Sequence, residues 1–106
     1  MNAGIKSFMR YSPSTMLRVE KAAYSNGRIA LRLFDAETEE PVATATINVP
    51  EADLASDEVI VKNYSENEGV TRTLILGGVI NPLPVSTLRT GHVLAEVYKL
   101  SEGWTK

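Results

Sequence analysis

Residues 16–35 read MLRVEKAAYSNGRIALRLFD and contain the clearest strand and turn signals in the chain. Apolar and polar residues alternate on both sides of Ser25-Asn26-Gly27, a pattern that predicts two half-buried strands. Asn and Gly adopt positive φ angles at low cost, so the tripeptide between the strands predicts a hairpin turn. We therefore predict an antiparallel hairpin of strands 16–23 and 29–35.

The length of the hairpin loop decides which side chains face the core. A two-residue turn at Asn26-Gly27 would place Val19 opposite Phe34 and separate the apolar faces of the two strands. A three-residue loop ending in Gly27 as a bulge places Val19 opposite Leu33 and brings those faces together. Because a slip of one residue moves every side chain to the other face, we predict the three-residue loop. Glu20 then lies opposite Arg32.

Two further segments follow as strands. Residues 42–49 alternate small and branched apolar residues with threonine, which predicts a third strand with Ala43, Ala45, Ile47 and Val49 facing inward. Pro50 ends this strand, an acidic loop covers residues 51–56, and Val59-Ile60-Val61 predicts a short strand over 58–62.

A helix is predicted over residues 66–76. Ser65 and Glu68 have the spacing of a capping box, in which each side chain bonds the backbone amide of the other residue. Gly77-Gly78 supplies the left-handed stop, and Gly69 inside the helix would cost up to about 1 kcal/mol relative to alanine. Residues 85–89 then predict an edge strand, and residues 92–100, apolar on both faces, predict a central strand.

Strands outnumber the helix, and hairpin connections dominate. The pattern predicts the α+β class, with a mainly antiparallel sheet of about five to six strands packed against one helix. The 106 residues suit a single domain, with residues 1–13 and 101–106 as loosely ordered ends. Trp104 in the second of these ends either docks back on the sheet or contacts a partner, and docking is favoured.

Composition argues against most catalytic chemistry. The chain has no cysteine, which excludes disulfides, thiolate zinc sites and cysteine nucleophiles. Its one histidine, His92, has no serine in a nucleophile context, and the carboxylates of Asp53, Asp57 and Glu58 lack a metal-loop spacing. We therefore expect no catalytic residue, no cofactor, no metal and no enzyme activity. No apolar run approaches the ~20 residues that span a bilayer, so we expect a cytoplasmic protein without membrane contact.

Charge is unevenly distributed along the chain. Ten of the thirteen acidic residues lie between Asp35 and Glu68, where Lys62 is the only basic residue. If folding keeps these residues together, they form a negative patch that steers a basic partner; otherwise they are ordinary solvated loops. Glu37, Glu39 and Glu40 are the candidate contact residues in the densest part of this segment.

Two other functions stay open. Arg18, Arg28 and Arg32 face outward beside Phe34 in the predicted register, which is a modest basic surface for nucleic acid. A small-molecule-sequestering protein would instead need a deep cavity with converging polar groups.

Part of the chain resembles a known family. Asn26-Gly27-Arg28-Ile29-Ala30-Leu31, the stretch ATATINVP at 43–50 and the stretch KNYSENEG at 62–69 resemble small proteins of unknown function from bacteriophages and mobile elements. The resemblance covers residues 26–80, about half of the chain, and KNYSENEG is its most specific part. It implies a phage or prophage accessory protein in the host cytoplasm, and such proteins often inhibit host defence. It carries over no catalytic residue.

The sequence thus favours a non-catalytic binding protein. Its acidic surface would bind a host protein or complex that has a basic surface. Residues 63–69 serve folding as a helix cap, or they serve contact through Tyr64, Glu66 and Asn67. An exposed edge strand would also allow a homodimer.

Overall fold

The computed structural model describes residues 6–63 and 69–105. Along the chain, the elements are β1 (Lys6–Ser12), β2 (Thr15–Ala23), β3 (Ile29–Asp35), β4 (Pro41–Thr44), β5 (Thr46–Ile47), β6 (Glu58–Val61), α1 (Val70–Leu76), β7 (Ser86–Thr90), β8 (Val93–Lys99) and a short 3-10 helix (Glu102–Trp104). None of the helices in these described ranges is long and apolar enough to cross a bilayer.

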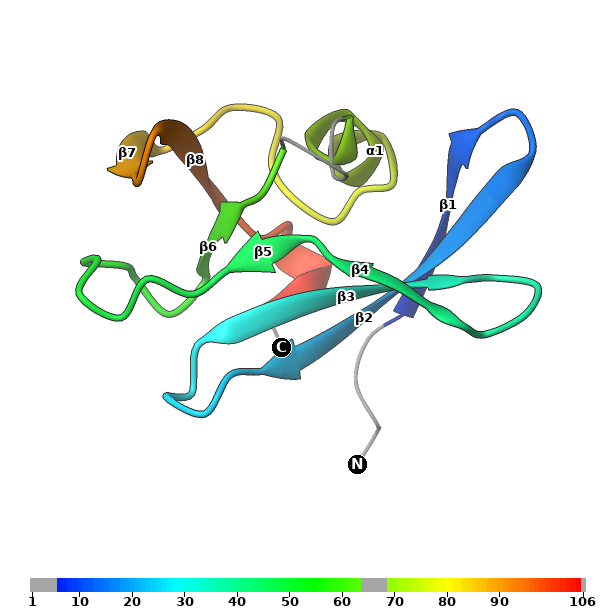
Figure 1. The fold of residues 1–106 in the computed structure, drawn as a ribbon, viewed down its shortest axis with the longest axis horizontal. Coiled ribbons are helices and arrows are strands. Elements are labelled where there is room, and N and C mark those ends of the chain that lie inside the picture. Colours follow the sequence, from blue (N-terminus) through cyan, green and yellow to red (C-terminus); the bar gives the residue numbers. More distant parts are fainter. Residues whose placement is uncertain (1–5, 64–68, 106) are drawn as a thin grey trace.

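The strands form two antiparallel sheets (Figure 1). The first sheet has the order β1-β2-β3-β4 and the second the order β5-β6-β8-β7. The α+β class and the mainly antiparallel pairing are confirmed. The expected strand number of five to six is wrong, because the described chain contains eight strands and divides them between two sheets.

The β2–β3 hairpin has the predicted register. Val19 pairs with Leu33, Glu20 with Arg32 and Ala23 with Ile29. The loop closes through the Tyr24 amide, which donates to the Arg28 carbonyl at 2.7 Å, and Gly27 takes a φ of 87° that disfavours any residue with a Cβ. Three residues therefore form the loop, and the apolar residues of both strands share the inner face of the first sheet.

The predicted third strand is divided in two, which corrects the expectation of one strand over 42–49. The chain leaves the first sheet at Thr44 and joins the second at Thr46, with Ala45 between them. The Ala45 amide donates to the Leu31 carbonyl of β3, and the Ala45 carbonyl accepts from the Lys62 amide just after β6, both at 2.8 Å. Since one residue bonds both sheets, the chain turns there. Ile47 and Val49 then pack against Ile60, Ala95 and Val97. They do not join the cluster that covers the inner face of β3.

The main core lies between the two sheets and α1. Its buried residues come from the inner face of the first sheet, from one face of the second sheet, from α1 and from the C-terminal segment: Met9, Leu17, Val19, Leu31, Leu33, Ala45, Val59, Val61, Val70, Leu74, Val79, Ile80, Tyr98, Leu100 and Trp104. Ile60, Ala95 and Val97 form a smaller cluster on the other face of the second sheet.

The described residues near each end of the chain take part in the fold. Residues 6–12 form β1, which pairs with β2, so the expectation of a loose end is wrong for these residues. Trp104 is 5% exposed in the main core, which confirms docking. Its carbonyl accepts from the ammonium group of Lys21 at 2.6 Å, and this bond ties the C-terminal segment to β2.

Helix α1 begins at Val70, after Gly69. Gly69 has a φ of 90°, so its expected place inside a helix is wrong: it is the left-handed residue that precedes α1. The predicted capping box of Ser65 and Glu68 lies outside the described residues. The side-chain oxygen of Asn63 accepts from the Thr71 amide at 2.9 Å and satisfies one amide of the first turn. The predicted stop is confirmed, because Gly78 has a φ of 76°.

The last two strands occupy the predicted places in the second sheet. β8 lies between β6 and β7. Tyr98 in β8 and Leu100 directly after it face the main core, whereas Ala95 and Val97 face the smaller cluster. β7 pairs with β8 alone and is therefore an edge strand.

Gly77 permits close packing of the end of α1 against β1. A Cβ at position 77 would lie 2.7 Å from Cγ and 2.8 Å from Sδ of Met9. We expect Gly77→Ala to lower the free energy of unfolding by about 1 kcal/mol or more, because Met9 is buried and must shift. Gly103→Ala is the matched control, since a Cβ at position 103 meets no atom within 4 Å. Urea denaturation of the two variants compares them, and equal stability would contradict this account.

Candidate interaction site at the acidic β3–β4 loop

The acidic segment does not fold into one patch. Within the described residues it divides between the loop that joins β3 to β4 and the loop at 48–57, which lie at opposite ends of the molecule (Figure 1). Glu37, Glu39 and Glu40 belong to the first loop, and Glu51 and Asp53 to the second. The negative charge therefore forms two separate sites, of which the first is the denser.

The β3–β4 loop is held in one conformation by its own main chain and by Asp35. A carboxylate oxygen of Asp35 accepts from the amides of Glu37 at 2.8 Å and of Thr38 at 3.1 Å. The Glu39 amide donates to the Asp35 carbonyl at 2.8 Å, and the Asp35 amide donates to the Glu40 carbonyl at 2.9 Å. These four bonds close a compact turn of the kind that aspartate favours at its first position.

Glu39 has the least favourable backbone conformation in this loop. Its φ is 65°, and it is the one described residue other than glycine with a positive φ. A non-glycine residue in this region carries a conformational cost, so its neighbourhood must hold it there. The side chain of Arg18 does so.

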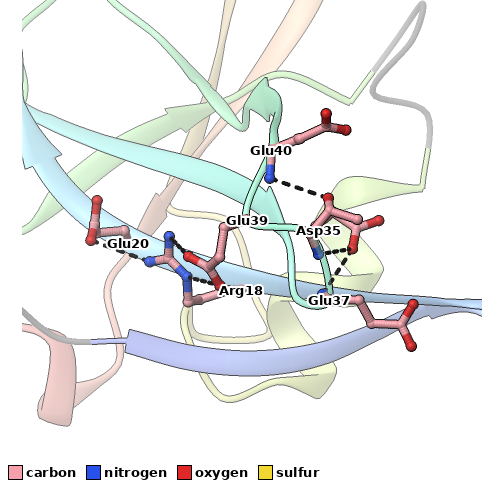
Figure 2. A network of polar contacts seen from close by, with 7 residues as sticks. Arg18, Glu20, Asp35, Glu37, Glu39 and Glu40 are labelled. Atoms are coloured by element: carbon pink, nitrogen blue, oxygen red, sulfur yellow. Dashed lines mark hydrogen bonds and ion pairs between the residues drawn. The ribbon is translucent and has the colours of Figure 1, made fainter.

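Arg18 reaches the loop from the outer face of the first sheet (Figure 2). Its Nη2 lies 2.7 Å from Oε1 of Glu39, and its Nε donates to Oε2 of the same carboxylate at 3.3 Å. Its Nη1 donates to Glu20 at 3.2 Å. The guanidinium also lies 4.3 Å from the centre of the Phe34 ring, which is its cross-strand neighbour. The two-point contact with Glu39 fixes both distance and orientation.

The environment of Arg18 stabilises its charged form. Hydrogen bonding to Glu39 is the main reason that the pKa of Arg18 lies above its usual value, and burial opposes the shift. The Arg18 side chain is 9% exposed, whereas that of Glu39 is 58% exposed. Glu39 is thus at the surface, but its carboxylate is already paired.

Two carboxylates in the loop remain directed outward. Figure 2 shows the side chains of Glu37 and Glu40 pointing away from Arg18, and both residues are exposed. Of the residues expected to contact a partner, Glu37 and Glu40 are therefore available, and Glu39 holds the loop. Tyr64, Glu66 and Asn67 lie outside the described residues.

The basic surface considered for nucleic acid is mostly engaged within the chain. Arg18 bonds Glu39 and Glu20, and Arg28 donates to the carbonyls of Val49 and Ala52 in the second acidic loop. Arg32 is exposed on the outer face of the first sheet. The sequence contained no sign of the Arg18–Glu39 pair, because its members are 21 positions apart and meet only when the β3–β4 loop folds back.

The other candidate ligand groups are dispersed. Asp57 is paired with Lys99 at 3.2 Å, and Glu58 lies 4.0 Å from the same ammonium group. In the described part of the chain no three acidic or histidine side chains gather as metal ligands. His92 is exposed in the turn between β7 and β8. With Arg89 and Glu96 it lines a hollow of about 590 Å³ that is open to solvent.

Tyr98 is the described residue in this region with a shifted pKa. Burial, followed by the hydrogen bond that its hydroxyl donates to Glu96 at 2.8 Å, raises the pKa of Tyr98 to about 12. Both effects favour the neutral phenol. The hydroxyl therefore acts as a hydrogen-bond donor to Glu96 at neutral pH.

Comparison with protein-family models, with curated proteins and with solved structures found no match to the chain.

The Arg18–Glu39 contact predicts a selective loss of stability. Glu39→Gln keeps the shape and the backbone conformation but removes the charge that Arg18 binds, so we expect a lower melting temperature and faster exchange of the Glu37 and Thr38 amides. Glu40→Gln makes the same change of charge at an outward residue and should leave both quantities unchanged. Equal effects of the two substitutions would show that Glu39 does not hold the loop.

The shifted pKa of Tyr98 predicts a loss of stability in alkali. A phenol whose pKa is about 12 in the folded chain and near 10 in the unfolded chain contributes stability below pH 10 that is lost as the pH rises toward 12. We expect the free energy of unfolding to fall across this window, and to fall less in Tyr98→Phe. Denaturation at several pH values tests this, and identical profiles would contradict it.

Proposed function

We propose that this protein acts without catalysis, by binding another protein through the acidic β3–β4 loop. The observation that carries the proposal is the clamp of Arg18 on Glu39, which holds the loop while Glu37 and Glu40 point into solvent. A loop held before binding loses less conformational entropy when a partner docks, so more of the contact energy appears as affinity.

The chemistry of the loop defines the partner as a basic protein surface. Two outward carboxylates on a rigid turn match lysine and arginine side chains, and complementary charge raises the association rate and selects the partner. The clamp also removes Glu39 from the contact, so we assign binding to Glu37 and Glu40 and positioning to Glu39 and Arg18.

The resemblance to small phage proteins supports a more specific proposal. We propose that the chain is a phage or prophage accessory protein of the host cytoplasm, and that its partner is a host protein or complex, such as one of a defence system. KNYSENEG at 62–69 is the most specific residue pattern behind this part of the proposal.

The two alternatives receive less support. Nucleic-acid binding would require Arg18 and Arg28, whose guanidinium groups are already bonded to Glu39 and to backbone carbonyls. Sequestration of a small molecule would require an enclosed cavity, whereas the hollow beside His92 is open to solvent. Neither feature favours these functions over protein binding.

The two acidic loops provide a matched test of the proposal. The variant Glu37→Lys with Glu40→Lys and the variant Glu51→Lys with Asp53→Lys change the net charge by the same amount at opposite ends of the molecule. Each is immobilised beside the wild-type chain, host lysate is passed over it at low and high salt, and captured proteins are identified by mass spectrometry. Affinity for a captured protein is then measured with purified components.

We expect the β3–β4 variant alone to lose the partner. Its affinity should fall roughly tenfold or more, since like charges at an interface cost on the order of 1.4 kcal/mol or more, and wild-type affinity should fall steeply with salt. Equal loss in both variants would indicate nonspecific charge attraction and contradict the proposal. So would binding that is insensitive to salt, or retention of a DNA or RNA probe that Arg32→Glu abolishes.

A further inference from the structure

β7 differs from the other edge strands in the described chain. Three edges carry features that discourage pairing with another strand. β1 has an irregular register near Ser12 and packs beside α1. β4 begins with Pro41 and has an irregular register against β3, and β5 has two residues.

β7 has none of those features. It is five residues long, it contains no proline, and its register with β8 runs without a shift from Ser86 to Thr90. Arg89 is its one charged residue, and most of the strand is exposed. A regular, exposed and nearly uncharged edge is a template for another strand.

The turn after β7 indicates which main-chain groups are available. Gly91 and His92 form a two-residue turn, and Thr90 pairs with Val93 on either side of it. Such a turn is closed by a hydrogen-bonded pair, and bonded and non-bonded pairs then alternate along the hairpin. The amide and carbonyl groups of Thr87 and Arg89 therefore point away from β8, toward the open edge.

We propose that β7 pairs with β7 of a second copy of this chain, antiparallel and centred on Leu88. This register places Thr87 opposite Arg89 of the second copy and Arg89 opposite its Thr87, so the outward groups on both sides form hydrogen bonds. A two-fold axis through Leu88 relates the copies, and the two second sheets become one continuous sheet.

Charge complementarity selects a second copy over an unrelated strand. The Arg89 side chain has no hydrogen bond or ion pair to the described residues, whereas Glu96 is held by Tyr98 at 2.8 Å. Glu96 is the cross-strand neighbour of Thr87 and lies on the same face as Arg89. In the proposed register, Arg89 of one copy and Glu96 of the other lie on the same face of the joined sheet. Their backbones are about two strand spacings, or roughly 10 Å, apart, and the extended side chain of Arg89 crosses Thr87 to approach the carboxylate. The two-fold axis repeats this approach.

Self-association through this edge should be weak. A five-residue edge buries less area than the ~1,200 Å² or more of a stable interface, although the exposed apolar side chains of Val85 and Leu94 border it. We expect sedimentation equilibrium to give the mass of one chain, 11.6 kDa, when dilute and a rising mass over roughly 1 µM to 1 mM. The Thr87 and Arg89 amides should exchange more slowly as concentration increases.

A pair of substitutions at one position isolates the main-chain contact. Thr87→Pro removes the outward amide without removing a bond to β8, and it should abolish self-association while circular dichroism shows that the fold is kept. Thr87→Val keeps the amide and should leave self-association intact. Arg89→Glu should weaken it, and added salt should weaken the wild-type dimer.

Two results would overturn the proposal: a wild-type chain that stays monomeric over the whole concentration range, or a dimer that Thr87→Pro leaves unchanged. The β3–β4 loop lies at the other end of the molecule from β7 (Figure 1). Substitution of Glu37 and Glu40 should therefore leave self-association unaltered, and Thr87→Pro should leave capture of a basic partner unaltered, so the two proposals can fail separately.

Discussion

Gly27 adopts a left-handed conformation in a three-residue loop, and the register that this loop sets between β2 and β3 determines the rest of the molecule. It brings Val19 and Leu33 to the inner face, where the main core forms. By the same alternation it places Arg18 beside Phe34 on the outer face. A slip of one residue would put Arg18 and Leu33 on the same face of the hairpin. Either the arginine would enter the core or the leucine would face solvent, so both the core and the acidic site depend on this loop.

The two sheets are joined by the backbone of Ala45. Its amide bonds β3 and its carbonyl bonds the residue after β6, so the chain passes between sheets without leaving either group unpaired. A buried amide or carbonyl without a partner would be costly, and Ala45 is fully buried. A larger side chain at this position would occupy core space between the sheets. The small residues at 43 and 45 thus allow a crossing of sheets as well as close packing.

The two proposed contacts use separate surfaces of the molecule. The acidic β3–β4 loop presents side-chain charge on a turn held by Arg18, whereas β7 presents main-chain groups on a regular edge. These surfaces lie at opposite ends of the molecule (Figure 1). A dimer formed through β7 would therefore leave the β3–β4 loop of each copy accessible. Two copies of the loop in one assembly would increase the avidity for a partner that has two basic sites.

Local patterns were sufficient for the elements whose stability is decided locally. The hairpin register and the end of α1 at Gly77-Gly78 follow from alternation and from the φ preferences of glycine. The central position of β8 follows from the apolar residues on both of its faces. The same patterns could not show that the strand at 42–49 divides, because its alternation is continuous and the division is made by hydrogen bonds to Leu31 and Lys62. β1 was missed since its residues show little periodicity and are held by pairing with β2.

The candidate site divides in the same way. The sequence determined that Glu37, Glu39 and Glu40 lie together in a polar connection, since they are neighbours in the chain. The pairing of Glu39, the outward direction of Glu37 and Glu40, and the position of Glu51 and Asp53 at the other end of the molecule all depend on how the whole chain folds. Neighbours in sequence share a loop, but the partner of a charge is set by which distant side chain the fold brings within hydrogen-bonding distance, here Arg18 from another strand.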